Sequence, residues 1–504
     1  MKISLVSSKA SSTQASLLVV LVAEWAPAKK KGTVPEALRE LDATFGGTLV
    51  SALAHEDYSG KKDSTCVLSS LGHTAQAKVA LVGLGKDAPT AASVRTALAK
   101  VARVANAEKV AEVLVQLPES FGPYLSAAAE GLELGAYKFS SYFTGDRAPK
   151  KVLTSAKFLL EGKTPSNAKA SIDRGLAIAA GVNVARDLSN EPPNVIYPES
   201  FAARAKAMAK ATGLTCKVID YKEVVRKKMG LLDAVGRGSE KKPCMVHLSY
   251  VPKAKPGAAK SANKRFVFVG KGVTFDTGGI SLKPGAGMQD MKHDMSGAAN
   301  VFGLMQIVAA LHPDIEVHGI MPLAENMPAG NAYRPGDIWT SYNGKTVEIQ
   351  NTDAEGRLIL ADALTYAVEL KPDFLVDNAT LTGAVVVALG TTCSGWYASS
   401  EETAQIFDAA VKVSGEQMWR MPLLEDQKDQ LKSEFADLKN VGDRWGGSIT
   451  AALFLREFIG ETKHWVHADI AGPAMADKLT RWDPRSGTGH GVLTFLSLIE
   501  NAEK

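Results

Sequence analysis

Short apolar runs alternate with segments of helical periodicity throughout the first 150 residues. Apolar runs of strand length occupy residues 17–23, 79–83 and 110–115, and helical periodicity occupies residues 91–105 and 124–137. This alternation predicts a small α/β domain over residues 1–150. The run at residues 17–23 follows a polar stretch and is closed by Glu24, which is typical of a buried strand rather than of a secretory signal.

The rest of the chain predicts a linker and then a larger α/β domain. Residues 151–190 are expected to form a linker and a bridging helix, with helical periodicity over 168–188. In the larger domain, residues 191–504, strand-like runs occur at 217–221, 245–250, 265–270, 316–321, 374–377 and 465–470. Helical patterns occur between several of them, at 198–211, 297–311, 358–370 and 448–459. This order predicts a helix-flanked, largely parallel sheet, whose ligand site would lie outside the carboxyl ends of the strands.

Composition agrees with a soluble protein of two domains. A length of 504 residues exceeds one ordinary core, and 45% hydrophobic with 22% charged residues is the balance of a folded chain. No apolar run approaches the roughly 18 residues that span a bilayer, so we expect a cytoplasmic protein without membrane contact. The four cysteines are far apart, which predicts free thiols in a reducing compartment. The net charge of +4 neither requires nor excludes a nucleic-acid partner.

Charged side chains gather first around the predicted strand at residues 266–269. Lys271 and Asp276 follow this strand, and Lys283 comes seven residues after Asp276, beyond a Gly-Gly pair that lets the backbone approach a ligand. Asp294 stands just before the next predicted helix. These residues therefore belong to loops that leave a strand, where the sheet predicts a site.

A second charged segment follows the strand-like residues 346–350. Asp353 and Glu355 are two positions apart, so both side chains face the same way in an extended backbone, and Arg357 continues that face. Four carboxylates at one place would raise one another's pKa unless cations compensate them. Divalent ions such as Zn²⁺, Mn²⁺ or Mg²⁺ suit such a cluster, and two of them can share bridging ligands.

Each of these residues also has an ordinary structural explanation. Asp294 could cap its helix, Asp353 and Glu355 could form a solvated turn, and Lys271 could pair with Asp276. Taken singly, these explanations are favoured. The combination of glycine-bearing loops with opposite charges makes a metal site the better prediction.

The charged segments closely resemble the two hallmark blocks of the leucyl aminopeptidase (cytosol aminopeptidase) family. The first block is Gly-Lys-Gly-Val-Thr-Phe-Asp-Thr-Gly-Gly at 270–279, continuing to Lys283, and the second is Asn-Thr-Asp-Ala-Glu-Gly-Arg at 351–357. The resemblance extends through residues 185–192, 376–384, 446–449 and 467–472. It spans essentially the whole larger domain, whereas residues 1–150 match only in general α/β character.

The resemblance implies a two-metal peptidase site. Lys271, Asp276, Asp294 and Glu355 would hold one divalent ion, and Asp276, Glu355 and both the side chain and carbonyl of Asp353 would hold the other. The ions would be Mn²⁺ or Zn²⁺, and a bridging hydroxide would attack the peptide. A lysine ligand must be neutral, because an ammonium has no lone pair to give.

The resemblance also implies roles for two cationic side chains. Lys283 would polarise the scissile carbonyl or stabilise the oxyanion, and Arg357 would hold a bicarbonate that acts as the general base. The free α-amino group of the substrate would bind the ion that Lys271 ligates, which makes the enzyme an exopeptidase.

Substrate preference and assembly also follow from the resemblance. The pocket for the first side chain would draw on Met291, Thr380, Gly383 and Met475, and an apolar pocket favours leucine or methionine with some breadth. The family assembles as a homohexamer, so we expect one here. Peptides with a free N-terminus would be the substrates.

Some residues depart from the family pattern or lie outside it. Asn378 stands where an apolar residue is usual, and His293 and the stretch at 489–491 also differ, which bears on specificity rather than on metal binding. The nine histidines include no HExxH arrangement, which excludes that type of metalloprotease. His464 and His467 are interpreted as ordinary strand residues.

Three other hypotheses remain open at this stage. Carboxylate-rich two-metal sites also serve phosphatases. A DNA-binding role, known among relatives, would use basic spots at residues 29–31 and at Lys61 and Lys62, although a solvated surface is the favoured explanation at a net charge of only +4. An inactive homologue would be expected to lack some of the seven charged site residues, all of which are present.

Overall fold

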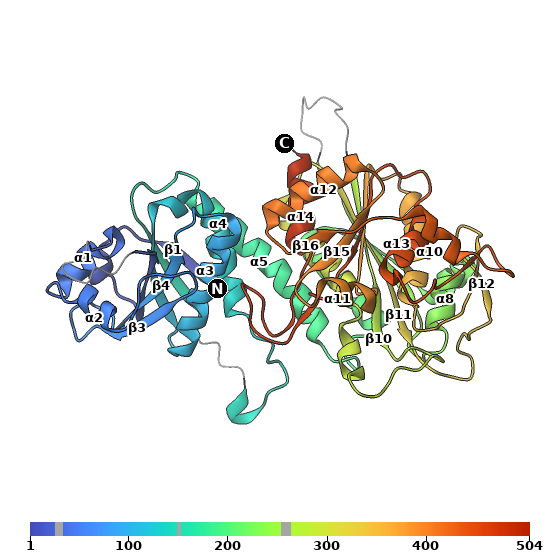
Figure 1. The fold of residues 1–504 in the computed structure, drawn as a ribbon, viewed down its shortest axis with the longest axis horizontal. Coiled ribbons are helices and arrows are strands. Elements are labelled where there is room, and N and C mark those ends of the chain that lie inside the picture. The colour runs from blue at the N-terminus through green and yellow to red at the C-terminus, as the bar shows by residue number, and fades with distance from the viewer. Residues whose placement is uncertain (26–33, 149–152, 254–263, 504) are drawn as a thin grey trace. The chain divides into compact units, whose positions relative to one another are not determined.

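The computed structural model describes residues 1–25, 34–148, 153–253 and 264–503 (Figure 1). The chain divides into two compact units. The N-terminal unit comprises Met1–Ala180 with Leu479–Pro484, and the C-terminal unit comprises Gly181–Lys478 with Arg485–Lys504. None of the four cysteines is in a disulfide, as the sequence predicted.

The N-terminal unit is built on a six-stranded sheet. Its order is β1-β6-β5-β2-β4-β3, and only the edge strand β3 is antiparallel to its neighbour. The strands are β1 (Lys2–Leu5), β2 (Leu17–Ala23), β3 (Thr65–Ser69), β4 (Lys78–Gly85), β5 (Glu112–Leu117) and β6 (Ser155–Leu160). The helices are α1 (Glu36–Thr44), α2 (Leu49–His55), α3 (Ala91–Ala107) and α4 (Leu125–Ala136), followed by α5 (Ala168–Asn190), which continues into the C-terminal unit.

Burial on both faces explains the continuous apolar run of β2. Leu17, Val19 and Leu21 pack with α3 and α4, whereas Leu18 and Val20 pack with α1 and α2 on the opposite face. Figure 1 shows these two helix pairs on either side of the sheet. The sequence prediction of a buried strand at residues 17–23 is therefore confirmed.

The C-terminal unit is built on a nine-stranded, mostly parallel sheet. Its order is β16-β15-β18-β14-β9-β11-β8-β7, and β10 also pairs with β11. The strands are β7 (Thr215–Ile219), β8 (Cys244–Tyr250), β9 (Arg265–Gly270), β10 (Gly272–Asp276), β11 (Glu316–Asn326), β14 (Phe374–Ala379), β15 (Ser394–Ala398), β16 (Met418–Arg420) and β18 (Trp465–Asp469). The central strands β18, β14, β9 and β11 are parallel. The predicted α/β class, with a helix-flanked and largely parallel sheet, is confirmed.

Helices cover both faces of this sheet (Figure 1). They are α6 (Pro198–Thr212), α7 (Tyr221–Arg226), α8 (Gly230–Gly236), α9 (Ser296–Leu311), α10 (Gly356–Val368), α11 (Gly383–Leu389), α12 (Glu401–Ser414), α13 (Gly447–Arg456) and α14 (Val492–Ala502). One core joins α8, α10 and α13 to one face of the sheet. Smaller sheets contain β12 (Ile338–Thr340), β13 (Thr346–Glu348) and β17 (Leu438–Lys439), and β19 (Met475–Ala476) with β20 (Ser486–Gly487).

One described helical stretch is long and apolar enough to cross a membrane. It covers residues 288–311, and 83% of its most apolar window is buried inside the protein. The expectation that no apolar run approaches this length was therefore wrong. The stretch combines a 3-10 helix at Met288–His293 with α9, whose side chains lie in the core between the sheet and α14. Its burial explains its hydrophobicity.

Candidate active site

The predicted charged residues come from loops at the carboxyl edge of the parallel strands. Lys271 lies between β9 and β10, and Asp276 ends β10. Asp294 directly follows the 3-10 helix, and Glu355 is the N-cap of α10, so Arg357 lies in the first turn of that helix. The structure thus brings together segments that are up to 86 positions apart in the sequence, counted from Lys271 to Arg357.

Three carboxylates form the centre of the site. Asp276, Asp353 and Glu355 each offer an oxygen, and these oxygens lie within 4.8 Å of one another. The Lys283 ammonium pairs with Asp276 at 2.8 Å and also with Asp353. Asp276 and Glu355 are buried, whereas Asp353 is partly exposed.

Lys271 lies beside this centre and links it to Asp294. Its Nζ is 2.8 Å from Asp294 and 2.9 Å from Glu355, and it donates a hydrogen bond to the carbonyl of Thr380 at 2.8 Å. Gly356 has no side chain where Lys271 passes. A Cβ at this position would lie 2.5 Å from Lys271 Cε and 2.6 Å from Nζ. The glycine therefore gives the lysine room to reach the carboxylates.

A glycine turn also holds Asp276 and Asp353 close together. Gly278 adopts φ +86°, a left-handed conformation that favours glycine, and its N–H donates to Asp276 Oδ1 at 2.9 Å. A Cβ at Gly278 would lie 2.4 Å from the carbonyl oxygen of Ser281 and 2.9 Å from Asp353 Oδ1. The sequence predicted that the Gly-Gly pair lets the backbone come close to a ligand site. In the structure the backbone at this pair comes close to the acidic centre.

Burial and mutual repulsion perturb the acidic groups. Burial, followed by the charge of Asp276, raises the pKa of Glu355 to about 8, and burial raises the pKa of Asp294 to about 6. Burial alone would lower the pKa of Lys271 and Lys283, but the neighbouring carboxylates outweigh it and raise both. The pKa values of Glu355 and Asp294 are raised even with both ammonium groups in place, so further positive charge would stabilise the ionised carboxylates.

Two buried carboxylate oxygens are available to ligate a cation. Glu355 Oε2 and Asp294 Oδ2 have no hydrogen-bond partner among the described residues, although buried polar atoms are nearly always paired. Carboxylate oxygens together with an amine nitrogen form a donor set that suits Zn²⁺ or Mn²⁺. The residues present therefore fit divalent metal ions.

Two buried residues that the sequence did not single out support the cluster. Asn326, at the end of β11, donates from Nδ2 to Asp276 Oδ1 and to the carbonyl of Thr352, both at 2.9 Å. The hydroxyl of Tyr333 also donates to the Thr352 carbonyl, at 2.6 Å. Asn326 ends β11 and pairs with Asp276, which ends the neighbouring strand β10, so the rule that pointed to Asp276 could also have found Asn326.

Arg357 is buried in the first turn of α10. Its Nη1 donates to the carbonyl of Asn440 at 2.9 Å, and its Nε has no partner among the described residues. Burial lowers its pKa to about 10. A buried guanidinium with unused hydrogen-bonding capacity suits a small planar anion.

The described contacts bring together only some of the residues that were predicted to form the pocket for the first substrate side chain. The hydroxyl of Thr380 donates to Asp294 Oδ1 at 2.7 Å, which places Thr380 beside the acidic cluster. Met475 lines a cavity of about 760 Å³ together with Phe275 and His293, the residues just before Asp276 and Asp294. Met291 lies in the 3-10 helix and Gly383 begins α11.

The interpretation of His467 as a strand residue agrees with its position in β18. Its Nδ1 is 2.6 Å from Asp377 Oδ1, and Trp465 donates to the other oxygen of Asp377 at 2.8 Å. His464 precedes β18 and stacks on Phe374. Asn378 donates from Nδ2 to the carbonyl of Val269 at 3.1 Å, under the loop that carries Lys271.

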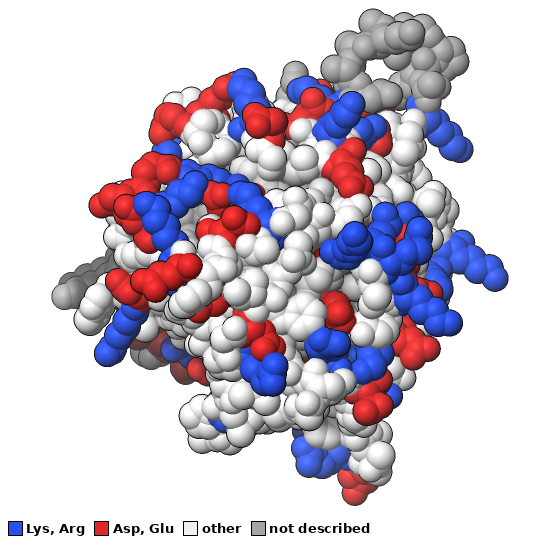
Figure 2. All heavy atoms as spheres, turned by 90° about the vertical axis from the view of Figure 1, so that its right-hand side faces the viewer, with Lys and Arg blue, Asp and Glu red and all other residues white. Residues whose placement is uncertain are grey.

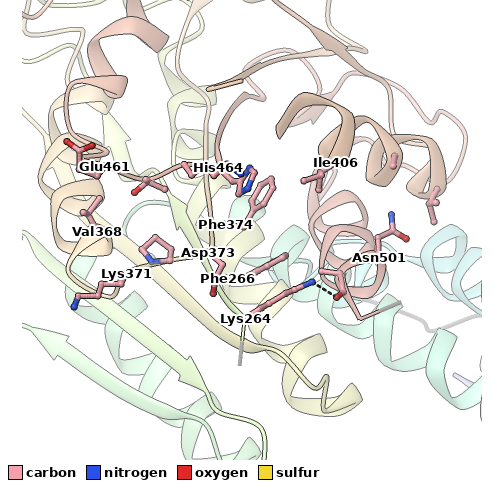
Figure 3. A pocket seen from close by; sticks show the side chains of 16 residues that line it. Lys264, Phe266, Val368, Lys371, Asp373, Phe374, Ile406, Glu461, His464 and Asn501 are labelled. Atoms are coloured by element: carbon pink, nitrogen blue, oxygen red, sulfur yellow. Dashed lines mark hydrogen bonds between the residues drawn. The ribbon is translucent and has the colours of Figure 1, made fainter. Parts of the chain in front are cut away.

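A separate cavity of about 1070 Å³ lies at the opposite edge of the sheet (Figure 3). Its walls include Phe266 and Phe374, near the amino ends of β9 and β14, and Ile406 of α12. None of the predicted site residues lines it. The acidic cluster is therefore confined to the carboxyl edge.

On the face drawn in Figure 2, acidic and basic side chains are interspersed over much of the surface, and a group of mostly basic side chains lies at the right of the view. Lys61 and Lys62 are exposed in the N-terminal unit, and residues 29–31 lie outside the described residues. No basic stripe of the kind that follows a nucleic-acid backbone is visible on this face.

Comparisons with known proteins match both units. The model of the cytosol aminopeptidase family catalytic domain matches residues 183–496, and the model of that family's N-terminal domain matches residues 19–145. A "Probable cytosol aminopeptidase" of Alkaliphilus metalliredigens is 39% identical over 513 aligned positions, covering 100% of both chains. Another with the same description, from Solibacter usitatus, is 44% identical and covers 91% of this chain and 93% of its own.

Two solved structures are similar over nearly the whole chain. A mutant of tomato leucine aminopeptidase has 33% identity and a TM-score of 0.90, covering 99% of this chain and 96% of that one. A bottromycin maturation enzyme in complex with Mn has 32% identity and a TM-score of 0.84, covering 97% and 100%.

Proposed function

The chain belongs to the cytosol aminopeptidase family and is a metal-dependent exopeptidase, and on this premise we propose that two divalent ions serve its reaction and that it prefers leucine and other apolar N-terminal residues. The observation that carries the proposal is the acidic centre. Oxygens of Asp276, Asp353 and Glu355 converge within 4.8 Å, and the buried Glu355 Oε2 has no hydrogen-bond partner in the part of the chain that the structure describes.

The two ions would divide the ligands between them. Lys271, Asp276, Asp294 and Glu355 would hold one, while Asp276, Glu355 and both the side chain and carbonyl of Asp353 would hold the other. When bound, such ions supply Lewis acidity that activates water and polarises a carbonyl. Mn²⁺ or Zn²⁺ would serve, and the similar enzyme described in complex with Mn supports manganese.

The two remaining cationic residues would act on the substrate and on a base. Lys283 keeps its ammonium at the mouth of the acidic centre, where it can stabilise negative charge that develops on the carbonyl oxygen. The buried Nε of Arg357 has no hydrogen-bond partner within the described ranges, which supports binding of a bicarbonate as general base.

The pocket for the first side chain would involve Met291, Thr380, Gly383 and Met475. Thr380 supports this assignment because it touches Asp294, so a substrate whose amine binds near Lys271 would place its side chain close by. Apolar walls favour leucine or methionine, but one methylene changes the binding free energy by only about 1–3 kcal/mol. Several N-terminal residues should therefore be accepted.

Assembly and location are also proposals. We expect a homohexamer in the cytoplasm. The buried position of the apolar stretch 288–311 and the description of the relatives as cytosol aminopeptidases support the cytoplasmic location. No comparison favours the alternative of a DNA-binding role, and the interspersed charges in Figure 2 give it no support.

The test is hydrolysis of leucine-p-nitroanilide by purified protein that has been stripped of metal and then given Mn²⁺ or Zn²⁺. Asp353→Ala and an N-acetylated substrate serve as controls. Release that requires metal and disappears with either control supports the mechanism. If the folded, metal-loaded protein releases no p-nitroaniline from several amino-acid anilides, the proposed mechanism is wrong.

A further inference from the structure

Thr380 directly follows β14 and forms hydrogen bonds with two proposed metal ligands. Its hydroxyl donates to Asp294 Oδ1 at 2.7 Å, and its carbonyl accepts from Lys271 Nζ at 2.8 Å. Lys271 and Asp294 are the two ligands assigned to one ion only. Within the described ranges, Thr380 forms no hydrogen bond with Asp353, the ligand assigned only to the other ion. Thr380 is therefore placed to act on one of the two proposed ions.

The hydroxyl of Thr380 makes the two oxygens of Asp294 different. Oδ1 accepts from this hydroxyl and also lies 2.8 Å from Lys271 Nζ. Oδ2 is buried and has no hydrogen-bond partner among the described residues. A residue that hydrogen-bonds a metal ligand fixes the orientation of that ligand. Thr380 therefore determines which oxygen of Asp294 is left for a cation.

Lys271 is held at both ends by the end of β14. Its backbone N–H donates to the carbonyl of Asn378 at 3.0 Å, and its Nζ donates to the carbonyl of Thr380, two residues further on. Asn378 also donates from Nδ2 to the carbonyl of Val269 at 3.1 Å. A lysine side chain has a flexible four-carbon stem, so a fixed acceptor at its far end limits where the nitrogen can lie.

Asp469 anchors the turn at residues 380–382, called here the template turn. It is fully buried at the end of β18. Its Oδ1 accepts from the backbone N–H groups of Leu381 at 3.1 Å and Thr382 at 3.4 Å, and its Oδ2 accepts from the Thr382 hydroxyl at 2.6 Å. Hydrogen bonds to an ionised group are the stronger ones, so the turn next to Thr380 has a defined position.

We propose that the template turn controls the binding of one of the two ions, with Thr380 and Asp469 acting as positioning residues for Lys271 and Asp294. This rests on the proposed function, because it takes the two-ion division of ligands as its premise. Without the Thr380 hydroxyl, Asp294 loses the donor that orients it, whereas the contacts of Asp353 are unchanged. The ion that uses Lys271 and Asp294 should therefore be lost first.

The experiment counts the Mn²⁺ bound by the metal-free full chain after equilibrium dialysis against buffered free Mn²⁺, with elemental analysis of the protein. The wild type should bind two ions per chain. Thr380→Val has a similar shape but no hydroxyl, and its affinity for one ion should fall by about 10–100-fold. At the free Mn²⁺ concentration that just fills the wild type, this variant should therefore retain one ion. Thr380→Ser, which keeps the hydroxyl, should retain two.

Two further variants identify the ion and test the anchor. Asp353→Ala removes a ligand of the other ion, so Thr380→Val combined with Asp353→Ala should retain neither ion at this Mn²⁺ concentration. Asp469→Asn places an NH₂ group against donors of the template turn and should weaken the same ion as Thr380→Val. Thr365→Val is the matched control and should bind two ions, because the partly buried hydroxyl of Thr365 donates to a carbonyl of its own helix.

A wild type that binds two ions, together with a Thr380→Val variant whose two affinities stay within about threefold of it rather than the expected 10–100-fold loss, would overturn the inference alone. Equal weakening of both ions, with a lower melting temperature of the metal-free variant, would also overturn it, because that result indicates a purely structural role. Failure of Thr380→Ser to restore the second ion would exclude the hydroxyl as the cause. A folded wild type that binds fewer than two ions would overturn the proposed two-ion function and the inference with it.

Discussion

Replacing Asn326 with leucine should weaken metal binding without removing a proposed ligand. Asn326 is fully buried at the end of β11, and its Nδ2 donates to Asp276 Oδ1 and to the carbonyl of Thr352, both at 2.9 Å. Leucine has a similar volume but no donor. The variant therefore deprives Asp276, a proposed bridging ligand, of a hydrogen bond while leaving little empty space.

The size of the effect follows from the donors that remain. Asp276 Oδ1 keeps the N–H of Gly278 at 2.9 Å, and the Thr352 carbonyl keeps the hydroxyl of Tyr333 at 2.6 Å. Neither acceptor becomes completely unsatisfied, so the loss should lie within the range for one hydrogen bond to a charged group, about 1.5–3 kcal/mol. Mutating a residue that hydrogen-bonds a metal ligand typically weakens metal binding by about 10–100-fold, which is consistent with that range.

The assay titrates metal-free protein with buffered free Mn²⁺. Binding is measured by competition with a fluorescent chelator and by the recovery of activity. Asn331→Leu is the matched control, because Asn331 is an exposed asparagine that donates to the carbonyl of Arg237, away from the acidic cluster. Its Mn²⁺ affinity should equal that of the wild type. If Asn326→Leu binds Mn²⁺ within about threefold of the wild type, against the expected 10–100-fold, then Asn326 does not support the metal site.

Three further predictions concern the fold around the site. Asp362→Asn should lower the free energy of unfolding, measured by urea denaturation, by about 1–3 kcal/mol. Both carboxylate oxygens of Asp362 accept hydrogen bonds from backbone N–H groups, and the NH₂ group of an asparagine would face some of these donors in place of an acceptor. Burial lowers the pKa of His247 to about 4, so as the pH falls this imidazole is protonated in the unfolded chain before it is protonated in the folded protein. The stability that is present above pH 6.5 should therefore be lost as the pH falls towards 4, by about 3 kcal/mol in full. His247→Gln should flatten this pH dependence of the free energy of unfolding, and an unchanged slope would contradict the assignment of the dependence to His247. Gly278→Ala should abolish metal-dependent activity, because a Cβ there meets the carbonyl oxygen of Ser281 at 2.4 Å; full activity would show that the turn can relax.

The sequence predicted strands best where they are buried on both faces. β2 and β9 contain continuous apolar runs because the side chains of residues 17–22 and 266–269 are buried. β11 extends to Asn326, five residues past its predicted end, through Pro322. A proline ordinarily argues against a central strand because it donates no ladder hydrogen bond. β15 was not predicted at all, since Ser-Gly-Trp-Tyr-Ala shows neither an apolar run nor a regular alternation.

For the site, the sequence could identify charged residues but not their supporting contacts. Lys271, Asp276 and Glu355 were found because they follow strands and because their motifs resemble those of a known family. The hydrogen bond from Thr380 to Asp294 joins positions 86 apart, and that from Asn326 to Asp276 joins positions 50 apart. No local periodicity encodes such pairs, because they arise only when the strands are assembled into a sheet.

The two lysines of the site differ in burial, and this difference accounts for their separate proposed roles. Both ammonium groups bridge two carboxylates, Lys271 between Asp294 and Glu355 and Lys283 between Asp276 and Asp353. The Lys271 side chain is only 4% exposed, whereas that of Lys283 is 21% exposed. Burial opposes the charge on each, and in the metal-free site the carboxylates outweigh it. Divalent cations would neutralise those carboxylates but would not restore solvent to Lys271. The more buried lysine should therefore lose its proton first and become a ligand, while Lys283 keeps its charge for the substrate carbonyl.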